Sequence, residues 1–251
     1  MWQSRDGHVL WRAAICGCVL FACSTVMAQT PDRRADTPYL EVFSGADVTR
    51  NSVFGYFGAA WALGRDVRGS GARMKILAGR GGYDYDTALP GNARETTIDG
   101  DVTLFQLMAG YQWQRGPWTL KGYAGIAWED HDLSPADPGN SVNGAEAAAI
   151  GQVEIWRNLG TRGFASLDAS YLGAYDGYYL QGRLGRRIKP RVSAGLEAAA
   201  LGNKEYDSGR GGAFLRFHLG ELDLTVSGGV SGDYYDADPG GYGSIGLYTR
   251  F

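Results

Sequence analysis

The chain has no cysteine after residue 28, because Cys16, Cys18 and Cys23 all lie near its N-terminus. The remainder therefore holds no disulfide, no cysteine-based metal site and no thiol nucleophile. A basic excess is also absent, since 24 Lys and Arg residues are outnumbered by 27 Asp and Glu residues and the formal net charge is −3. This balance gives no support to a nucleic-acid partner.

Long apolar runs are scarce, and the main one lies within residues 1–28. Arg5 and Arg12 precede an apolar stretch, and the small residue Ala28 ends a cleavage-site pattern. We predict that residues 1–28 are a secretory signal peptide and residues 29–38 a short periplasmic segment. A transmembrane helix is the competing interpretation, but the stretch falls short of the roughly 20 residues that a span needs. Lipoprotein processing at Cys23 is a second alternative.

Proline is absent from every segment that alternates between apolar and polar residues. A central strand loses a ladder hydrogen bond at proline, so the position of all eight prolines outside these segments supports reading them as strands. Twelve strands are predicted, at Tyr39–Val48, Ser52–Leu63, Gly71–Tyr85, Asp99–Gln114, Trp118–Asp130, Gly144–Trp156, Gly163–Tyr175, Gly177–Arg187, Arg191–Leu201, Gly209–Leu219, Leu222–Tyr234 and Gly241–Phe251.

Glycine is abundant, with 39 of 251 residues, about twice the usual share of roughly 7%. These glycines are spread through the alternating segments, as in sheets that curve. A sheet that enters lipid must close into a barrel, because open edges would leave backbone groups unpaired. The sequence therefore predicts an all-β, antiparallel, up-and-down transmembrane β-barrel over residues 39–251. We expect about 12 strands, an outer-membrane location and both termini in the periplasm.

Two features sharpen the membrane prediction. Trp118 and Trp128 share one face of a strand, and at a tilt near 40° they stand roughly 25 Å apart along the membrane normal, the height of a lipid-facing band. The chain ends with Ile245, Leu247, Thr249 and Phe251 on one face of the last strand. This ending resembles the closing strand of bacterial outer-membrane barrels, which usually ends in phenylalanine.

Several stretches resemble one family, the cellulose biosynthesis protein BcsS family. The most specific is the segment His131–Glu146, HDLSPADPGNSVNGAE. The others are Phe43–Asp47, Gly110–Trp113 with Gly122–Gly125, Gln181–Gly185, and Glu197 with Ala200–Asn203. The resemblance covers about residues 40–251. It implies bacterial cellulose biosynthesis or secretion and an outer-membrane address, and it carries over no catalytic residue.

Charged residues that fall on the inward face of the predicted strands are candidates for a polar lumen. The candidates are Lys75, Lys121, Glu129, Glu154, Arg183, Arg187, Glu197 and Arg216. Two interpretations stay open, a polar conduit and an ion-paired plug. Eight strands leave room only for side chains and sixteen leave a channel, and twelve lies between them.

The longest connection between strands is the candidate functional loop, since long loops in compact folds tend to be functional or disordered. Prolines and turn-forming polar residues predict an ordered loop, in which Asp132, Ser134 and Asp137 bond nearby backbone amides. Its candidate residues are His131, Asp132, Ser134, Pro135, Asp137, Pro138, Asn140, Ser141 and Glu146. Nine tyrosines crowd the strand ends near the acidic loops, and a girdle at the lipid interface is favoured over stacking against a glucan. They are Tyr83, Tyr85, Tyr175, Tyr178, Tyr179, Tyr206, Tyr234, Tyr235 and Tyr242.

We therefore expect an outer-membrane accessory of cellulose biosynthesis, acting as a conduit or a docking barrel. Its expected partners are outer-membrane lipid and lipopolysaccharide, and cellulose or components of its secretion machinery. The alternative is an outer-membrane enzyme acting on lipid or glycan. His131 and His218 are the only histidines after residue 28, and no serine stands beside either at a recognisable spacing. No catalytic motif, metal site or cofactor is predicted, but Ser, His and Asp clustered at one rim would favour the enzyme.

Overall fold

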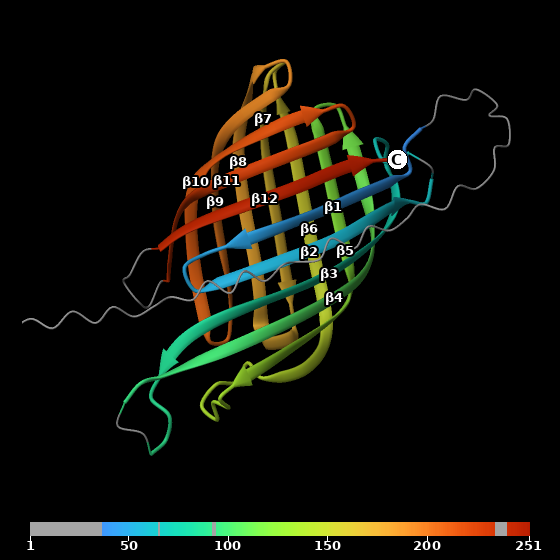
Figure 1. The fold of residues 1–251 in the computed structure, drawn as a ribbon. Helices are drawn as coiled ribbons and strands as arrows, with labels where there is room; N and C mark the ends of the chain where they lie inside the picture. The colour runs from blue at the N-terminus through green and yellow to red at the C-terminus, as the bar shows by residue number, and fades with distance from the viewer. Residues whose placement is uncertain (1–36, 65, 92–93, 234–239) are drawn as a thin grey trace, which may run out of the picture. The chain divides into compact units, whose positions relative to one another are not determined.

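The computed structural model describes residues 37–64, 66–91, 94–233 and 240–251. The predicted signal peptide and most of the segment 29–38 lie outside these ranges. Within them, twelve antiparallel strands pair in sequence order, and β1 pairs with β12 to close a barrel (Figure 1). The predicted all-β, antiparallel, twelve-stranded barrel is confirmed.

The strands are β1 Leu40–Val48, β2 Ser52–Ala62, β3 Gly71–Thr87, β4 Thr96–Arg115, β5 Trp118–Ser134, β6 Gly144–Leu159, β7 Gly163–Leu172, β8 Gly177–Lys189, β9 Val192–Asn203, β10 Tyr206–Leu219, β11 Leu222–Asp233 and β12 Gly240–Arg250, with a 3-10 helix, η1, at Ala174–Asp176. Among the described residues, no helix is long and apolar enough to cross a membrane.

Strands β3, β4 and β5 are longer than the alternation of the sequence predicts. Strand β4 begins at Thr96 instead of Asp99, and β5 ends at Ser134 instead of Asp130. Main-chain pairing continues to Asp99 opposite Ser134, because an antiparallel ladder needs aligned backbones and not alternating side chains. Strand β7 is instead shorter than predicted, since it ends at Leu172 and not at Tyr175. The helical backbone angles of Gly173, φ −66° and ψ −23°, turn the chain out of the ladder into η1.

The outer surface of the barrel is apolar and its interior is charged. Leu107 and Ile126 are paired across β4 and β5, and Ile126 is 66% exposed. Residues of the opposite parity point inward, and Lys75 and Glu41 among them are each only 5% exposed. This pattern is the inverse of a soluble protein, and it is what strands spanning a lipid bilayer require. Trp118 and Trp128 lie on the exposed face, as the membrane prediction needs.

The two ends of the barrel differ. Gly116, Gly160 and Gly220, each with positive φ, lie in tight turns at one end, near the chain terminus Phe251. We call this end the turn end. The other end, the loop end, carries the connection between β5 and β6, residues 135–143, which we call the long loop.

An apolar cluster fills the interior toward the loop end. Inward-facing residues of β4, β5 and β6, including Met108 and Ile150, pack there with Val142 of the long loop and with Ala174 and Tyr175 of η1. Because Val142 and η1 join inward-facing residues, the connections at this end fold into the barrel mouth instead of standing clear of it.

Candidate functional site

All eight lumen candidates have the inward parity in their strands. They are Lys75 on β3, Lys121 and Glu129 on β5, Glu154 on β6, Arg183 and Arg187 on β8, Glu197 on β9 and Arg216 on β10. They do not form one site. Instead, five of them belong to two ion-paired groups, one glutamate, Glu129, bonds to a histidine, and two arginines lie near the turn end.

The first group joins four side chains from four strands. Lys75 Nζ lies 2.5 Å from Glu154 Oε1 and 3.0 Å from Gln152 Oε1. Lys121 Nζ lies 2.7 Å from Glu41 Oε2 and 3.5 Å from Glu154 Oε2. We call Glu41, Lys75, Lys121 and Glu154 the lysine network. Since β1, β3 and β5 are not neighbours in the sheet, these contacts cross the interior instead of following the wall.

The second group is centred on Glu197. This carboxylate accepts hydrogen bonds from Arg183 Nε at 2.8 Å, from the Tyr242 hydroxyl at 2.8 Å and from the Ser227 hydroxyl at 3.1 Å. The donors come from β8, β12 and β11, so the group ties one side of the barrel wall together. We call these four residues the Glu197 group.

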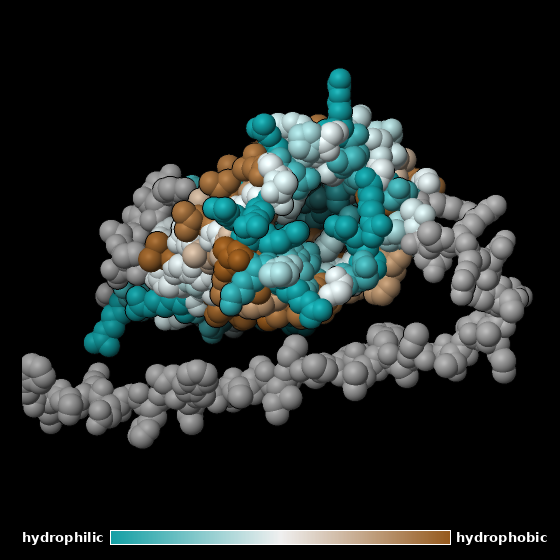
Figure 2. All heavy atoms as spheres, turned by 90° about the horizontal axis from the view of Figure 1, so that it is seen from above, coloured by the Kyte–Doolittle hydropathy of each residue, from teal (hydrophilic) through white to brown (hydrophobic). Residues whose placement is uncertain are grey.

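Several charged side chains of these groups are buried in the lumen. A water-filled channel would leave its lining charges accessible, but Glu197 is 6% exposed and Lys75 and Glu41 are buried as well. Arg210 of β10 adds another bridge, 2.7 Å from Asp47 of β1. Of the two interpretations of the lumen charges, the geometry favours the ion-paired plug at this level. The turn end is more open, and Figure 2, which looks onto it, shows hydrophilic side chains around a central hollow.

The long loop is held in place by residues from other parts of the chain. The Tyr85 hydroxyl donates to Asp137 Oδ2 at 2.9 Å and accepts from Asn140 Nδ2 at 2.8 Å. The backbone N–H of Ser141 donates to Glu205 Oε1 at 3.0 Å, and its hydroxyl contacts the same oxygen. The loop is therefore attached both to β3 and to the connection between β9 and β10.

The base of the loop is held by η1. The Tyr175 hydroxyl donates to the backbone oxygens of Gly144, at 2.7 Å, and Asn143, at 3.2 Å. Burial, aided by the negative charge of Glu146 nearby, raises the pKa of the Tyr175 phenol, which keeps it a protonated donor. Tyr83, Tyr85 and Tyr175 thus point into the barrel mouth and not toward lipid. The predicted lipid-facing girdle does not include them, and Tyr234 and Tyr235 lie outside the described residues.

The candidate loop residues have different surroundings. His131 lies in β5 and is buried, with Nδ1 2.9 Å from the Tyr83 hydroxyl and Nε2 2.7 Å from Glu129 Oε1. Asp137 accepts from the backbone N–H of Gly139 at 3.0 Å, as expected of a turn residue.

The remaining loop candidates lie at the edges of the loop or on its surface. Asp132 and Ser134 lie within β5 with exposed side chains, so they are strand residues and not turn residues. Glu146 is an inward-facing residue of β6 opposite Glu129, and Pro135 and Pro138 are exposed on the loop.

A third polar cluster, which the sequence does not predict, lies near the turn end. Ser193, His218 and Asp223 come from β9, β10 and β11, and the histidine contacts both of the others. A signal for it is the turn at Gly220, which sets His218 opposite Asp223. The placement of Ser193 depends on the register of the next hairpin, which the spacing of residues does not reveal. Within the described residues, no group of three or more His, Cys, Asp or Glu side chains is arranged to hold a metal ion.

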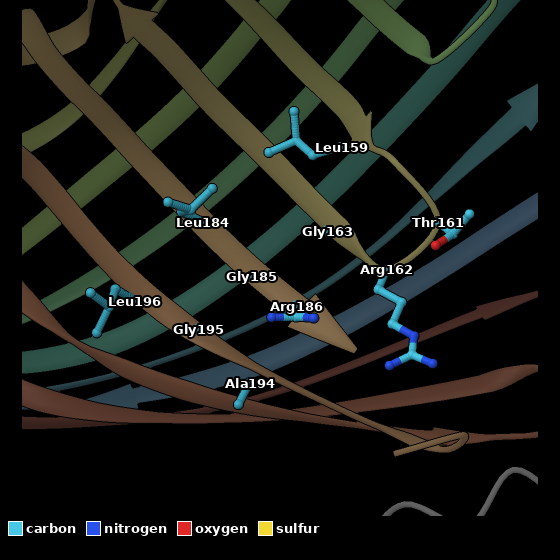
Figure 3. A pocket seen from close by; sticks show the side chains of 10 residues that line it. All are labelled: Leu159, Thr161, Arg162, Gly163, Leu184, Gly185, Arg186, Ala194, Gly195 and Leu196. Atoms are coloured by element: carbon cyan, nitrogen blue, oxygen red, sulfur yellow. The ribbon is translucent and has the colours of Figure 1, made fainter. Parts of the chain in front are cut away.

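The exterior carries a shallow groove near the turn end. Leu159, Leu184 and Leu196 line it together with Arg162 and Arg186, as Figure 3 shows. Leu184 and Leu196 are among the most exposed apolar residues of the barrel, so the groove belongs to the surface that meets lipid. Arginines at such an edge are suited to phosphate groups of lipids.

A closed antiparallel barrel with an apolar exterior, a charged interior and tight turns at one end is a β-barrel of the outer-membrane class. The predicted outer-membrane location agrees with this architecture. The family model described as cellulose biosynthesis protein BcsS matches residues 41–251. The chain belongs to this family, and the predicted assignment to cellulose biosynthesis is confirmed.

Several solved structures are similar. KdgM porin is 9% identical, with a TM-score of 0.45 over 84% of this chain and 99% of that chain. The translocator domain of the autotransporter NalP from Neisseria meningitidis is 12% identical, with a TM-score of 0.48 over 86% and 90%. The outer membrane protein Omp33 of Acinetobacter baumannii is 14% identical, with a TM-score of 0.42 over 87% and 100%. No curated protein matches the chain in sequence.

Proposed function

We propose that this barrel serves cellulose secretion as a docking barrel, in which the long loop offers a fixed surface to the glucan or to another component of the secretion machinery. The observation that carries the proposal is the attachment of the loop at three places, through Tyr85, Glu205 and Tyr175. A loop held in one conformation loses little conformational entropy when a partner binds it. The role requires no catalytic step.

The exposed part of the loop is suited to such a contact. Pro135 and Pro138 are exposed and stiffen the backbone, while Asp137 beneath them is almost fully buried. The prolines are therefore accessible to a partner, whereas Asp137 forms hydrogen bonds that hold the loop in place. At the opposite end, the groove with Arg162 and Arg186 is the surface that we propose to contact outer-membrane lipid.

The orientation that this role needs is both termini and the turn end in the periplasm, with the loop end outside the cell. The even strand number puts both termini on one side, and short periplasmic turns with longer external loops are usual in outer-membrane barrels. We extend the proposal to residues 1–28 as a cleaved signal peptide and to residues 29–38 as a periplasmic segment.

The orientation predicts the protease sensitivity of inserted tags. A tag at Gly139 in the long loop should be cleaved by protease added to intact cells, whereas a tag at Gly116 in the β4–β5 turn should be cleaved only after the outer membrane is permeabilised. Immunoblots of both variants provide the measurement. Cleavage of the Gly116 tag alone on intact cells would reverse the orientation and remove the long loop from the cell surface.

A conduit is the competing function, because the turn end is hollowed. The two functions differ in the conductance of the purified barrel in planar bilayers. Since the lysine network crosses the lumen, we expect the wild-type protein to show no large steady conductance. Replacing Lys75 and Glu154 by alanine should raise the conductance and leave cellulose output no higher. A large wild-type conductance, together with loss of cellulose when Lys75 is changed to Trp, would instead establish the conduit.

A further inference from the structure

The third polar cluster has the geometry of a nucleophilic site. Ser193 Oγ lies 3.0 Å from His218 Nε2, and His218 Nδ1 lies 2.7 Å from Asp223 Oδ1. We propose that Ser193, His218 and Asp223 form a Ser–His–Asp site that cleaves the carboxylic ester of an O-acylated saccharide at the turn end of the lumen. The proposal goes beyond docking and does not depend on it.

The hydrogen bonds assign a role to each residue. An ionised Asp223 only accepts, so Nδ1 of His218 carries the hydrogen and Nε2 is left as the acceptor for the Ser193 hydroxyl. This is the tautomer in which histidine acts as a general base toward serine, with the carboxylate fixing the ring. Nε2 therefore faces the serine and Nδ1 faces the aspartate, as general-base catalysis requires. With the two partners exchanged, the nitrogen facing the serine would carry the hydrogen and could not accept its proton.

Strand pairing holds the three residues rigidly. His218 is paired with Asp223 across β10 and β11, and Ser193 is paired with Arg216 across β9 and β10. The backbone N–H of His218 donates to the Arg191 oxygen at 2.8 Å, which fixes its position at the strand end. Sites on regular strands keep catalytic groups in place better than sites on loops do.

The surroundings supply groups for an acyl-transfer reaction. Arg216, the neighbour of Ser193 in the register, stacks its guanidinium against the rings of Trp156, Phe164 and Phe214. Its Nε donates to Thr225 Oγ1 at 3.2 Å, and among the described residues it makes no salt bridge. We assign its terminal N–H groups the role of stabilising the oxyanion of a tetrahedral intermediate.

The position of the site indicates which class of substrate can reach it. Ser193 faces the lumen, so an ester of a bilayer lipid cannot reach it without leaving the membrane. The mouth on this side is hydrophilic and hollow (Figure 2), and the Trp156 and Phe164 rings stack 4.5 Å apart beside it. The aromatic rings can pack against a pyranose ring, and the arginine and the polar side chains of the mouth can hydrogen-bond to its hydroxyl and acyl groups. Family membership in cellulose biosynthesis makes a saccharide substrate consistent with the location.

The reaction balances with water as the second substrate. Ser193 Oγ bonds to the acyl carbon while its proton passes to His218 Nε2. The tetrahedral intermediate then breaks its C–O bond to the saccharide, whose oxygen takes that proton and leaves as the alcohol. Water attacks the acyl-serine with His218 again as base, and the carboxylic acid leaves as Ser193 regains its proton. Ser193 is only 2% exposed, so the side chains packed around it must move aside to admit the ester.

A fluorophosphonate probe on the full-length barrel, in outer membranes and after purification in detergent, tests the site. Mass spectrometry should find the probe on Ser193, and labelling should fall to background in Ser193→Ala and His218→Ala. Asp223→Asn should label on the order of 10⁴-fold more slowly, because the amide favours the wrong histidine tautomer. Ser208→Ala is the matched control, since Ser208 is equally buried and its hydroxyl bonds Ser231 and the Gly232 oxygen and no histidine.

Every variant is first shown to be folded by its heat-modifiable migration, and hydrolysis of an acetylated cello-oligosaccharide is then measured. We expect release of acetate that requires Ser193 and His218. Absence of label on Ser193 in folded wild-type protein, or labelling that persists in His218→Ala, would overturn the site. Faster turnover of phospholipid vesicles than of the acetylated saccharide would overturn the substrate class.

Discussion

Replacing Pro135–Asn140 with a short Gly/Ser linker is expected to leave a folded barrel and to lower cellulose output several-fold. The replacement removes Asp137 and Asn140, which anchor the loop to the Tyr85 hydroxyl, and the two exposed prolines. The strands do not depend on the loop for pairing, so assembly into the outer membrane should continue. Cellulose bound per cell, measured beside the amount of heat-modifiable barrel, separates loss of function from loss of protein.

A gentler variant isolates the ordering of the loop from its sequence. Tyr85→Phe keeps every loop residue but removes the hydroxyl that bonds both Asp137 and Asn140, and it should lower cellulose output in the same direction by less. Tyr206→Phe, at an exposed tyrosine of β10, is the matched control and should have no effect. His218→Ala should leave the amount of cellulose nearly unchanged. Normal cellulose after the loop replacement, with loss after His218→Ala, would reject docking in favour of catalysis as the main role.

Glu154→Leu is expected to destabilise the barrel strongly. It leaves Lys75 without its ion-pair partner and Lys121 with Glu41 alone, in a part of the lumen where Lys75 and Glu41 are buried. Removing one member of a buried ion pair typically costs about 3–5 kcal/mol, because the remaining charge is uncompensated. The free energy of unfolding, measured by tryptophan fluorescence against urea in lipid vesicles, should fall by an amount of this order.

Two further variants check the cause. Val153→Ala, on the neighbouring outward position of β6, should change the unfolding midpoint little. Adding Lys75→Met to Glu154→Leu removes the uncompensated charge while the pair of Lys121 and Glu41 remains, so most of the lost stability should return. If Glu154→Leu unfolds at the same urea concentration as Val153→Ala, the lysine network does not stabilise the barrel.

The strands could be predicted because their signal is local. Gln106 lies between Phe105 and Leu107, and this alternation alone shows which face of the strand meets lipid. No information about any other strand is needed. The parity of Lys75, Lys121 and Glu154 follows from the same alternation. The ends of β4 and β5 could not be predicted this way, since beyond the lipid band the ladder continues through residues under no requirement to alternate.

The partners of the functional residues could not be predicted, because they lie far apart in the chain. Lys121 and Glu41 are separated by 80 positions, and His131 and Tyr83 by 48. No spacing rule links such residues, and many other pairings of the same charges would satisfy composition equally well. His218 shows the difference most clearly, since its nearest serine in space, Ser193, is 25 positions away and belongs to another strand.

By itself the sequence determined the barrel, its strand number, the faces of its strands and its family, since each is recorded in local alternation, turn residues and a specific segment. Only the tertiary structure decided that charged side chains pair across the lumen, that hydrogen bonds hold the long loop in place and that a serine, a histidine and an aspartate meet at the turn end. The physical reason is that closure of the sheet sets the register of every hairpin at once. Register alone decides which inward-facing side chains come within hydrogen-bonding distance across the interior.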